Sequence, residues 1–212
     1  MPTLIYVADP MCSWCYGFGP ELLLLKDGLP EAPIEIVLGG LRAHNKEKVT
    51  TAFKNTLLSH WKQVAESSGV PFSEEGLAQH DFIYDTEPAC RAVVTARTLA
   101  PDAVLAVFLA IQHAFYAEGK NVTDGKVLSD VTVAALGQCG VQIASDTFYA
   151  KWSSQSMIDA TQEDFKLTQQ WNIIGFPTLI LEHNGRLDLV TSGFARTEAL
   201  VEKMQEIIDR PN

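Results

Sequence analysis

The chain has 212 residues, of which 47% are hydrophobic and 20% are charged. This length predicts one large domain or one domain with an insertion, and the composition excludes a disordered or collagen-like chain. The 26 acidic and 16 basic residues give a formal charge of -10, so the surface repels phosphate backbones and anionic membranes. We therefore expect neither nucleic acid nor a membrane as a partner.

The distribution of apolar and basic residues bears on the compartment. The longest apolar run, 103–111, is less than half of the roughly 20 residues that cross a bilayer. No basic residue precedes Lys26, and Asp9 interrupts the first apolar stretch, which argues against a secretory signal. Four cysteines are too few for a disulfide-stapled fold. We expect a cytoplasmic protein.

The first 40 residues read as strand, helix and strand. A run rich in β-formers covers residues 3–8, a leucine-rich helix is expected over 20–29, and a second strand is expected over 34–38. Parallel strands need a crossover connection, and a helix usually supplies it. This order therefore predicts a βαβ unit.

From about residue 44 to 172, strand-like runs disappear and helical periodicity takes over. The predicted helices cover 50–67, 86–99, 102–117, 129–139, 145–152 and 157–171, whereas 72–85 shows no readable pattern. Strands return at 178–181 and 187–191 around an Asn184-Gly185 turn, before a last helix over 197–208. We interpret this order as a discontinuous domain of residues 1–43 and 173–212 that carries an inserted helical domain, 44–172.

Two cysteines, Cys12 and Cys15, directly follow the first strand, and we place them at the start of a helix. At this spacing their sulfurs can close a small disulfide ring, and the helix amides and dipole favour a thiolate on Cys12. Cys12 would be the exposed nucleophile, and Cys15, one turn inward, would resolve the mixed disulfide. Ser13 and Trp14 add dipole and bulk around the nucleophile.

Other interpretations of the cysteines are weaker. A zinc site needs four ligands, and neither the remaining cysteines nor the five histidines have a suitable spacing, so no metal is expected. A pair of structural buried thiols would not need the strand-to-helix context. Cys90 and Cys139 are interpreted as small core residues on helix faces.

Gly175-Phe176-Pro177 precedes an apolar strand, where proline often marks a sheet edge or a cis bond. A cis Pro177 that faces the cysteine pair would leave the backbone of Phe176 free to pair with an extended substrate, so Phe176 and Gly175 are candidate substrate-binding residues. Asp9 either accepts the proton of Cys15, if it is buried, or caps the end of the strand. Gly39-Gly40 indicates either a close backbone approach near the cleft or a simple turn.

Asp9, the Cys12-Ser13-Trp14-Cys15 motif and Phe176-Pro177, with a helical block between them, resemble the DsbA-like branch of the thioredoxin superfamily. Within it the chain looks most like the FrnE-like group of cytoplasmic predicted protein-disulfide isomerases. The resemblance implies an α/β, thioredoxin-like fold with a large all-helical insertion, in which Cys12 is the nucleophile, Cys15 the resolving cysteine and Pro177 the cis proline.

Two further details follow from the resemblance. The periplasmic oxidant of this branch has Pro-His between its cysteines, where this chain has Ser13-Trp14, so a strongly oxidising potential is not expected. The run Thr86 to Arg91 is similar to a helix start that borders the active site in these relatives. We therefore expect Cys90 and Arg91 near the cleft.

These features favour a thiol-disulfide oxidoreductase, similar to a protein disulfide isomerase or reductase, that acts on disulfide-containing proteins or small-molecule thiols. No bound cofactor is expected, and glutathione is considered as a co-substrate. The alternative is a glutathione-dependent isomerase or transferase of the 2-hydroxychromene-2-carboxylate isomerase or kappa class, although these relatives have a serine at the nucleophile position. A non-enzymatic binding module is the third hypothesis. The sequence does not set the oligomeric state.

Overall fold

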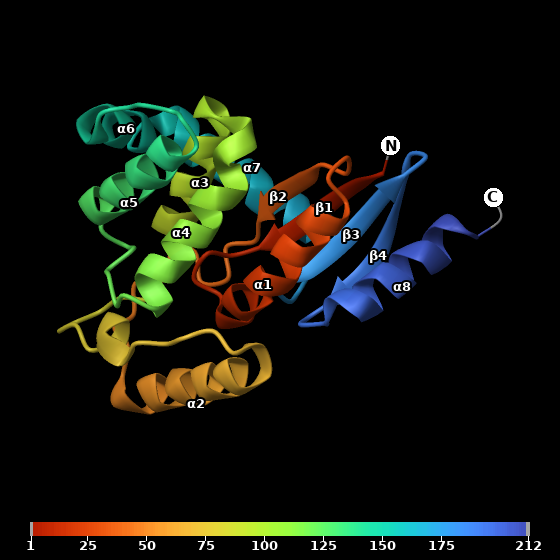
Figure 1. Ribbon diagram of the computed structural model, residues 1–212. Helices are drawn as coiled ribbons and strands as arrows, with labels where there is room; N and C mark the ends of the chain where they lie inside the picture. The colour runs from red at the N-terminus through yellow and green to blue at the C-terminus, as the bar shows by residue number, and fades with distance from the viewer. Residues whose placement is uncertain (1, 211–212) are drawn as a thin grey trace.

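The computed structural model describes residues 2–210, and its centre is a four-stranded sheet in the order β2-β1-β3-β4 (Figure 1). The strands are β1 (Thr3–Ala8), β2 (Ile34–Leu38), β3 (Thr178–His183) and β4 (Arg186–Ser192). β1 pairs in parallel with β2 and antiparallel with β3, which forms a hairpin with β4. The predicted βαβ unit and the later hairpin are therefore both present.

The crossover helix α1 (Ser13–Gly28) begins seven residues before the expected start, and Pro20 lies inside it. An interior proline removes one backbone hydrogen bond and crowds the preceding turn. The structure tolerates this cost because α1 packs deeply into the core. Cys15, Phe18 and Leu22 on this helix are fully buried.

Six α-helices lie between β2 and β3, and one more follows β4, among the described residues. They are α2 (Thr51–Ser68), α3 (Glu87–Leu99), α4 (Val104–Tyr116), α5 (Gly125–Gln138), α6 (Ser145–Trp152), α7 (Gln155–Gln170) and α8 (Thr197–Ile208), with short 3-10 turns at Glu74–Leu77 and Pro101–Ala103. α5 begins four residues earlier than predicted because the Asp124 carboxylate accepts from the backbone N–H groups of Lys126 and Val127. The fold is α/β with a helical insertion, as expected.

The helices cover the two faces of the sheet unequally. α1 and α8 contact each other in front of the strands in Figure 1, and α7 packs behind, against β2. One hydrophobic core runs from the front of the sheet through α1 into α3, α4 and α5. A smaller cluster behind the sheet includes Ile5, Val37 and Ile180. Because the inserted helices share the main core, the domain division at residues 44 and 172 stays a prediction.

A partly buried ion pair joins the helical block to the edge of the sheet. The Arg97 guanidinium donates to both carboxylate oxygens of Asp164, at 2.9 and 2.7 Å, and to the Ile36 carbonyl at 2.8 Å. Asp164 also accepts from the backbone N–H of Leu38 at 3.0 Å. One carboxylate thus fixes α3 and α7 to β2.

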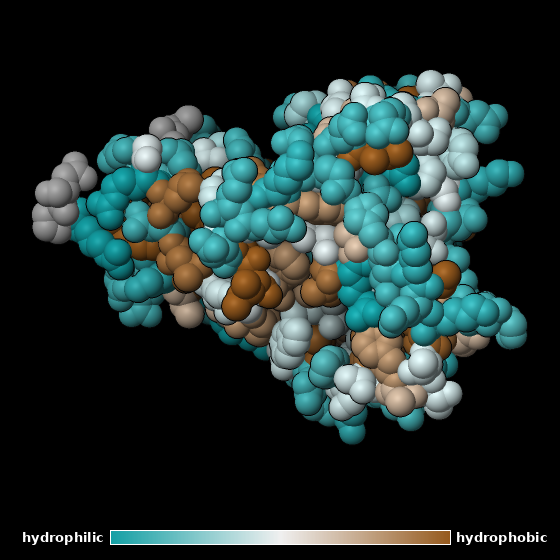
Figure 2. Space-filling view, turned by 180° about the vertical axis from the view of Figure 1, so that it is seen from behind, coloured by the Kyte–Doolittle hydropathy of each residue, from teal (hydrophilic) through white to brown (hydrophobic). Residues whose placement is uncertain are grey.

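The back of β3 and β4 is less covered. Leu187 and Leu189 are half-exposed, Ile174 is fully exposed, and they border a hollow of about 320 Å³. Figure 2 looks from behind and shows apolar side chains gathered on the half of the surface that holds these strands. Within residues 2–210, no helix combines the length and hydrophobicity that a membrane span requires.

Candidate functional site

Cys12 occupies the N-cap position of α1, at the point where β1 gives way to the helix. Its backbone is extended, its N–H donates to the Asp9 carbonyl at 3.0 Å, and its carbonyl accepts the first helical bond, from Tyr16, at 3.0 Å. The Cys12 thiol lies 3.6 Å from the Phe176 carbonyl, to which it donates, and the residue is 6% exposed. The positive end of the α1 dipole therefore lies beside this sulfur.

Cys15 lies one turn deeper and is fully buried. Burial raises the pKa of the Cys15 thiol well above its ordinary value, and its hydrogen bond with Cys12 and the nearby negative charges act in the same direction. The Tyr6 hydroxyl donates to the Cys15 carbonyl at 3.3 Å and holds this turn against the sheet. The two cysteines of the motif are therefore in contact but differ in exposure.

The second half of the site is the segment before β3. The Phe176-Pro177 peptide bond is cis, as predicted, and Pro177 is buried. The Phe176 ring lies against the turn after β2, where a β-carbon on Gly39 would lie 2.0 Å from the ring. The interpretation of Gly39 as a close-approach glycine is confirmed. The Gly175 carbonyl accepts from the Thr178 hydroxyl at 2.8 Å, which fixes the entry into β3.

Asp9 is fully buried behind the cysteine motif. Its carboxylate accepts from the backbone N–H groups of Met11 and Leu41, both at 2.7 Å, so it caps the strand end, one of the two alternatives given by the sequence. Desolvation raises the pKa of Asp9, and hydrogen bonds from its neighbours oppose that rise. A hydrogen bond between the backbone of Asp9 and the Cys15 thiol acts to lower the pKa of that thiol. A role as proton acceptor stays a prediction.

Two tyrosines complete the site, and the sequence reasoning missed both. Tyr84 donates its hydroxyl proton to the Met11 carbonyl, and its oxygen lies 3.3 Å from the hydroxyl of Tyr116. Burial raises the pKa of both hydroxyl groups. Tyr84 lies in the segment without a readable pattern, where the apolar run Phe82, Ile83 and Tyr84 is the one sequence signal. In the structure Phe82 and Tyr84 are buried and Ile83 is exposed.

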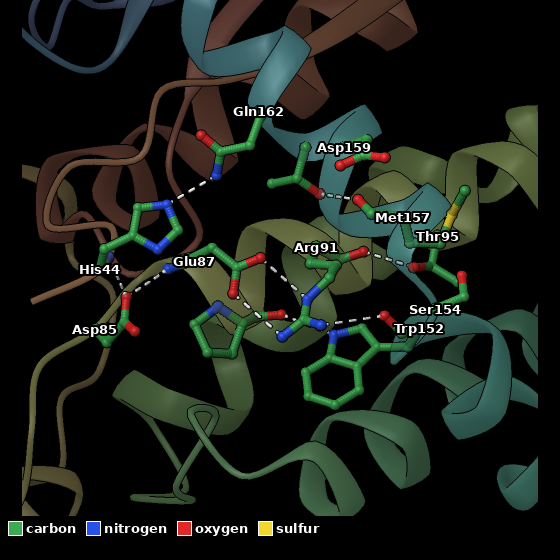
Figure 3. A network of polar contacts seen from close by, with 12 residues as sticks. His44, Asp85, Glu87, Arg91, Thr95, Trp152, Ser154, Met157, Asp159 and Gln162 are labelled. Atoms are coloured by element: carbon green, nitrogen blue, oxygen red, sulfur yellow. Dashed lines mark hydrogen bonds and ion pairs between the residues drawn. The ribbon is translucent and has the colours of Figure 1, made fainter.

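Cys90 and Arg91 separate at the start of α3. Cys90 is buried, and its thiol lies 3.5 Å from the Asp9 carboxylate, so it is behind the cysteine motif. Arg91 turns away towards α6, where it stacks over Trp152 at 4.0 Å and pairs with Glu87 at 3.0 Å (Figure 3). Arg91 therefore belongs to the packing of the helical block rather than to the site.

An open groove of about 580 Å³ begins beside the motif. Trp14 and Phe176 form one end, and Trp14 lies 5.9 Å, centroid to centroid, from Phe194. Arg196 supplies a positive charge, which pairs with Glu21 at 2.8 Å. Ser13 is the first residue of α1 and is partly exposed. Among residues 2–210, no group of three or more histidine, cysteine or acidic side chains is arranged to hold a metal ion.

Comparison with known proteins identifies this architecture. A family model described as thioredoxin matches residues 5–201. The crystal structure of a candidate protein disulfide isomerase from Nitrosomonas europaea is 32% identical, covers 100% of this chain and 99% of its own, and superposes with a TM-score of 0.88. No curated protein sequence gives a significant match.

More distant structures share the fold. The cytosolic disulfide reductase DsbM from Pseudomonas aeruginosa is 23% identical, with 97% of this chain and 98% of that chain covered and a TM-score of 0.78. The same enzyme with GSH gives 21% identity, coverage of 98% and 100%, and a TM-score of 0.76. With a family match over most of its length and a cysteine pair at the tip of α1, the chain belongs to the thioredoxin family.

Proposed function

We propose that this protein is a thiol-disulfide oxidoreductase of the disulfide isomerase or reductase type, with Cys12 as nucleophile and Cys15 as resolving cysteine. The observation that carries the proposal is the asymmetric placement of the two thiols. Cys12 lies at the helix tip beside the Phe176 carbonyl, and Cys15 is buried one turn deeper in contact with it.

The proposed reaction has two exchange steps. The Cys12 thiolate attacks one sulfur of a substrate disulfide, forms a mixed disulfide with it and releases the other sulfur as a thiolate, which takes up a proton. Cys15 then loses its proton and attacks the Cys12 sulfur, which releases the second substrate thiolate. The substrate gains two electrons, and the Cys12–Cys15 pair becomes a disulfide that an external dithiol or glutathione must reduce again.

The surroundings suit this order of attack. The buried Cys15 has a raised pKa and so stays protonated until a mixed disulfide forms on Cys12. The Phe176 carbonyl that now accepts from the Cys12 thiol lies where an extended substrate backbone would pair. Beside it, Trp14 and Phe194 offer apolar walls for substrate side chains.

We propose disulfide-containing proteins and small-molecule thiols as substrates, with no bound cofactor and with glutathione as a co-substrate. DsbM, which shares the fold, is a cytosolic disulfide reductase with a GSH complex, and this supports both the small thiol and a cytoplasmic location. Gly175, Phe176 and Pro177 would form the substrate-binding side of the site, and Asp9, Ser13 and Trp14 would tune the cysteine pair.

The experiment is reduction of insulin disulfides, with refolding of scrambled ribonuclease as a second assay. We expect Cys12→Ser to reduce the rate to that measured without protein, because serine cannot form the mixed disulfide. Cys139→Ser is the matched control, because Cys139 is an exposed cysteine at the end of α5. Wild-type rates in the Cys12→Ser variant would refute the proposal.

The same assays separate the glutathione-dependent alternative. An isomerase or transferase that needs one thiol keeps its turnover when Cys15 is replaced, because no internal disulfide has to form. The dithiol mechanism predicts that Cys15→Ser stops at the mixed disulfide. Glutathione turnover that survives Cys15→Ser would favour the alternative.

A further inference from the structure

The Asp9 carboxylate is buried among hydrogen-bond donors. The backbone N–H groups of Met11 and Leu41 donate at 2.7 Å each, the Cys90 thiol lies at 3.5 Å, and the Thr86 hydroxyl is a fourth partner. Among the described ion pairs, none involves Asp9 with a lysine or arginine. A protonated carboxyl group would need an acceptor for its own proton, whereas these partners act as hydrogen-bond donors towards it. The surroundings therefore fit the ionised form of Asp9.

Two of these donors, the side chains of Thr86 and Cys90, come from the start of α3. Thr86 is the N-cap residue, but its hydroxyl makes no capping hydrogen bond to the helix. The Thr86 oxygen instead accepts from the backbone N–H of Arg42 at 3.1 Å, which leaves its proton for Asp9. Cys90 is fully buried, and burial together with the Asp9 charge raises its pKa well above the ordinary thiol value. Cys90 therefore remains a donor.

Burial raises the pKa of Cys15 most, and the contact with Cys12 adds to that rise. A hydrogen bond with the Asp9 backbone lowers the pKa of Cys15, and Coulomb repulsion from the Asp9 charge is a smaller contribution that raises it. The Asp9 charge therefore adds to the burial that disfavours a negative charge at Cys15. The other titratable and charged groups near Asp9 or its donors are Tyr84 and Tyr116, Glu87 on α3, and Arg42 in the turn after β2.

We propose that Cys90 and Thr86 are positioning residues that hold Asp9 as a fixed buried anion, which adds to the effect of burial in opposing loss of the Cys15 proton while the pair is reduced. The proposal rests on the proposed dithiol function for its consequence, but the hydrogen-bonded arrangement itself does not depend on turnover. It gives Cys90 a role as a hydrogen-bond donor and not as a third redox thiol.

The first test measures the ionisation of Asp9 directly. Carbon-13 NMR of labelled aspartate carboxyl groups follows the titration, and Asp9→Asn identifies the resonance. We expect Cys90→Ala to raise the pKa of Asp9 by about half to one unit, because a donor to a buried carboxylate is lost. Cys90→Ser keeps a donor and should restore most of the wild-type value. Cys139→Ser should leave it unchanged.

Several outcomes would overturn this arrangement. An unchanged Asp9 titration in Cys90→Ala would show that the thiol does not support the carboxylate. An equal shift in Cys90→Ala and Cys90→Ser would show that volume, and not donation, matters. If Cys90→Ala does not fold, Thr86→Val against Thr86→Ser makes the same comparison at the other donor. None of these measurements needs disulfide exchange, so their failure is separate from failure of the proposed function.

The second test measures the consequence for Cys15. In protein that carries Cys139→Ser, Cys12 is converted to its mixed disulfide with 5-thio-2-nitrobenzoate, and release of the coloured thiolate reports attack by Cys15. Removing the Asp9 charge should move the pH of half-maximal release rate down by about one unit, because a repulsion against the Cys15 thiolate is gone. A half-point that is unchanged in Asp9→Asn, or that moves upward as loss of a proton acceptor would require, would overturn the proposal.

Discussion

The chemistry of each cysteine in this chain is set by its immediate surroundings. Cys12 lies at a helix tip with only 6% of its surface exposed, and Cys15 and Cys90 are fully buried. Cys139 is exposed after α5, so its interpretation as a core residue was wrong. Burial raises the pKa of both Cys15 and Cys90, so these two thiols lack both access and the anionic form that reacts. The four cysteines therefore differ in reactivity according to their surroundings.

This difference predicts an order of alkylation. With iodoacetamide near neutral pH, Cys139 should be modified at least about tenfold faster than Cys90 in the folded protein, because Cys139 is exposed whereas burial blocks access to Cys90 and raises its pKa. Peptide mass spectrometry after timed quenching measures each site. In urea the two rates should converge. Equal rates in the folded protein would contradict the burial of Cys90.

At this scale, the sequence was sufficient for residues whose chemistry is local. The spacing of Cys12 and Cys15 and the cis Pro177 could be predicted, because a short motif encodes them. Tyr84 and Tyr116 could not, since long-range packing brings Tyr84 to Met11 and Tyr116 to Tyr84, from segments that have no catalytic motif. The contact between Cys90 and Asp9 spans 81 positions and was likewise beyond local patterns.

At the scale of elements, α1 is positioned by close packing on one side and by a buried carboxylate on the other. Gly17 faces α2, where an added β-carbon would lie 2.5 Å from Val64 and 3.1 Å from the Ser68 hydroxyl. Gly28, at the end of the same helix, has open space around it. The leucine pattern alone placed the start of this helix at residue 20, because tertiary contacts along residues 13–19, rather than local propensity, stabilise its first turns. The cysteine motif was the one signal for the earlier start.

The two glycines make a matched pair for mutation. Gly17→Ala should destabilise the protein by about 1–2 kcal/mol, because overpacking against the buried Val64 exceeds the gain in helix propensity. Gly28→Ala should change the free energy of unfolding by no more than about 0.5 kcal/mol, in the stabilising direction. Urea unfolding measures both. A neutral Gly17→Ala would show that α2 does not pack on α1 as described.

Glu21 joins α1 to the start of α8 and makes stability depend on pH. Burial acts to raise the pKa of Glu21, but hydrogen bonds from Thr197 and Arg196 outweigh it and hold the pKa below the ordinary 4.5. The two Thr197 bonds, from the backbone N–H and the hydroxyl, measure 2.8 and 2.5 Å. Because the folded pKa is depressed, this stabilisation is present above the unfolded pKa and is lost as pH falls through the folded value.

Glu21→Gln should therefore cost about 2 kcal/mol at neutral pH, since hydrogen bonds to a charged group are lost. The difference from wild type should shrink as the pH falls below 4.5, where the wild-type carboxylate becomes protonated. Glu202→Gln, on the exposed side of α8, is the control and should change little. Urea midpoints across this pH range measure the effect, and a difference independent of pH would argue against the ion.

At the scale of the whole molecule, the helical block and the sheet share one core and one polar anchor. Arg97 and Asp164 pair through two hydrogen bonds, and each makes one more to β2, to a carbonyl and to an amide of that strand, which ties α3 and α7 to the sheet. The inserted arrangement was predictable because the periodicity changes at both ends of the block. The anchor was not, because the two side chains lie 67 positions apart and pair only after the chain folds.

Asp164→Asn should lower the free energy of unfolding by about 2–3 kcal/mol, because it leaves a partly buried guanidinium without its charge partner. Asp159→Asn, on the exposed side of α7, should have little effect. In wild type, tryptophan fluorescence and circular dichroism should follow one urea transition, as a shared core requires. Two separate transitions would mean that the insertion folds independently.

The central claim is that Cys12 forms the bond to substrate and that Cys15 removes it, and intact-protein mass spectrometry tests this most directly. Cys15→Ser protein, mixed with oxidised glutathione, should accumulate one glutathione adduct that peptide mapping locates on Cys12, whereas wild type should pass to the internal disulfide without holding the adduct. A persistent adduct on wild-type Cys12, or modification of Cys139 alone in the variant, would contradict the account.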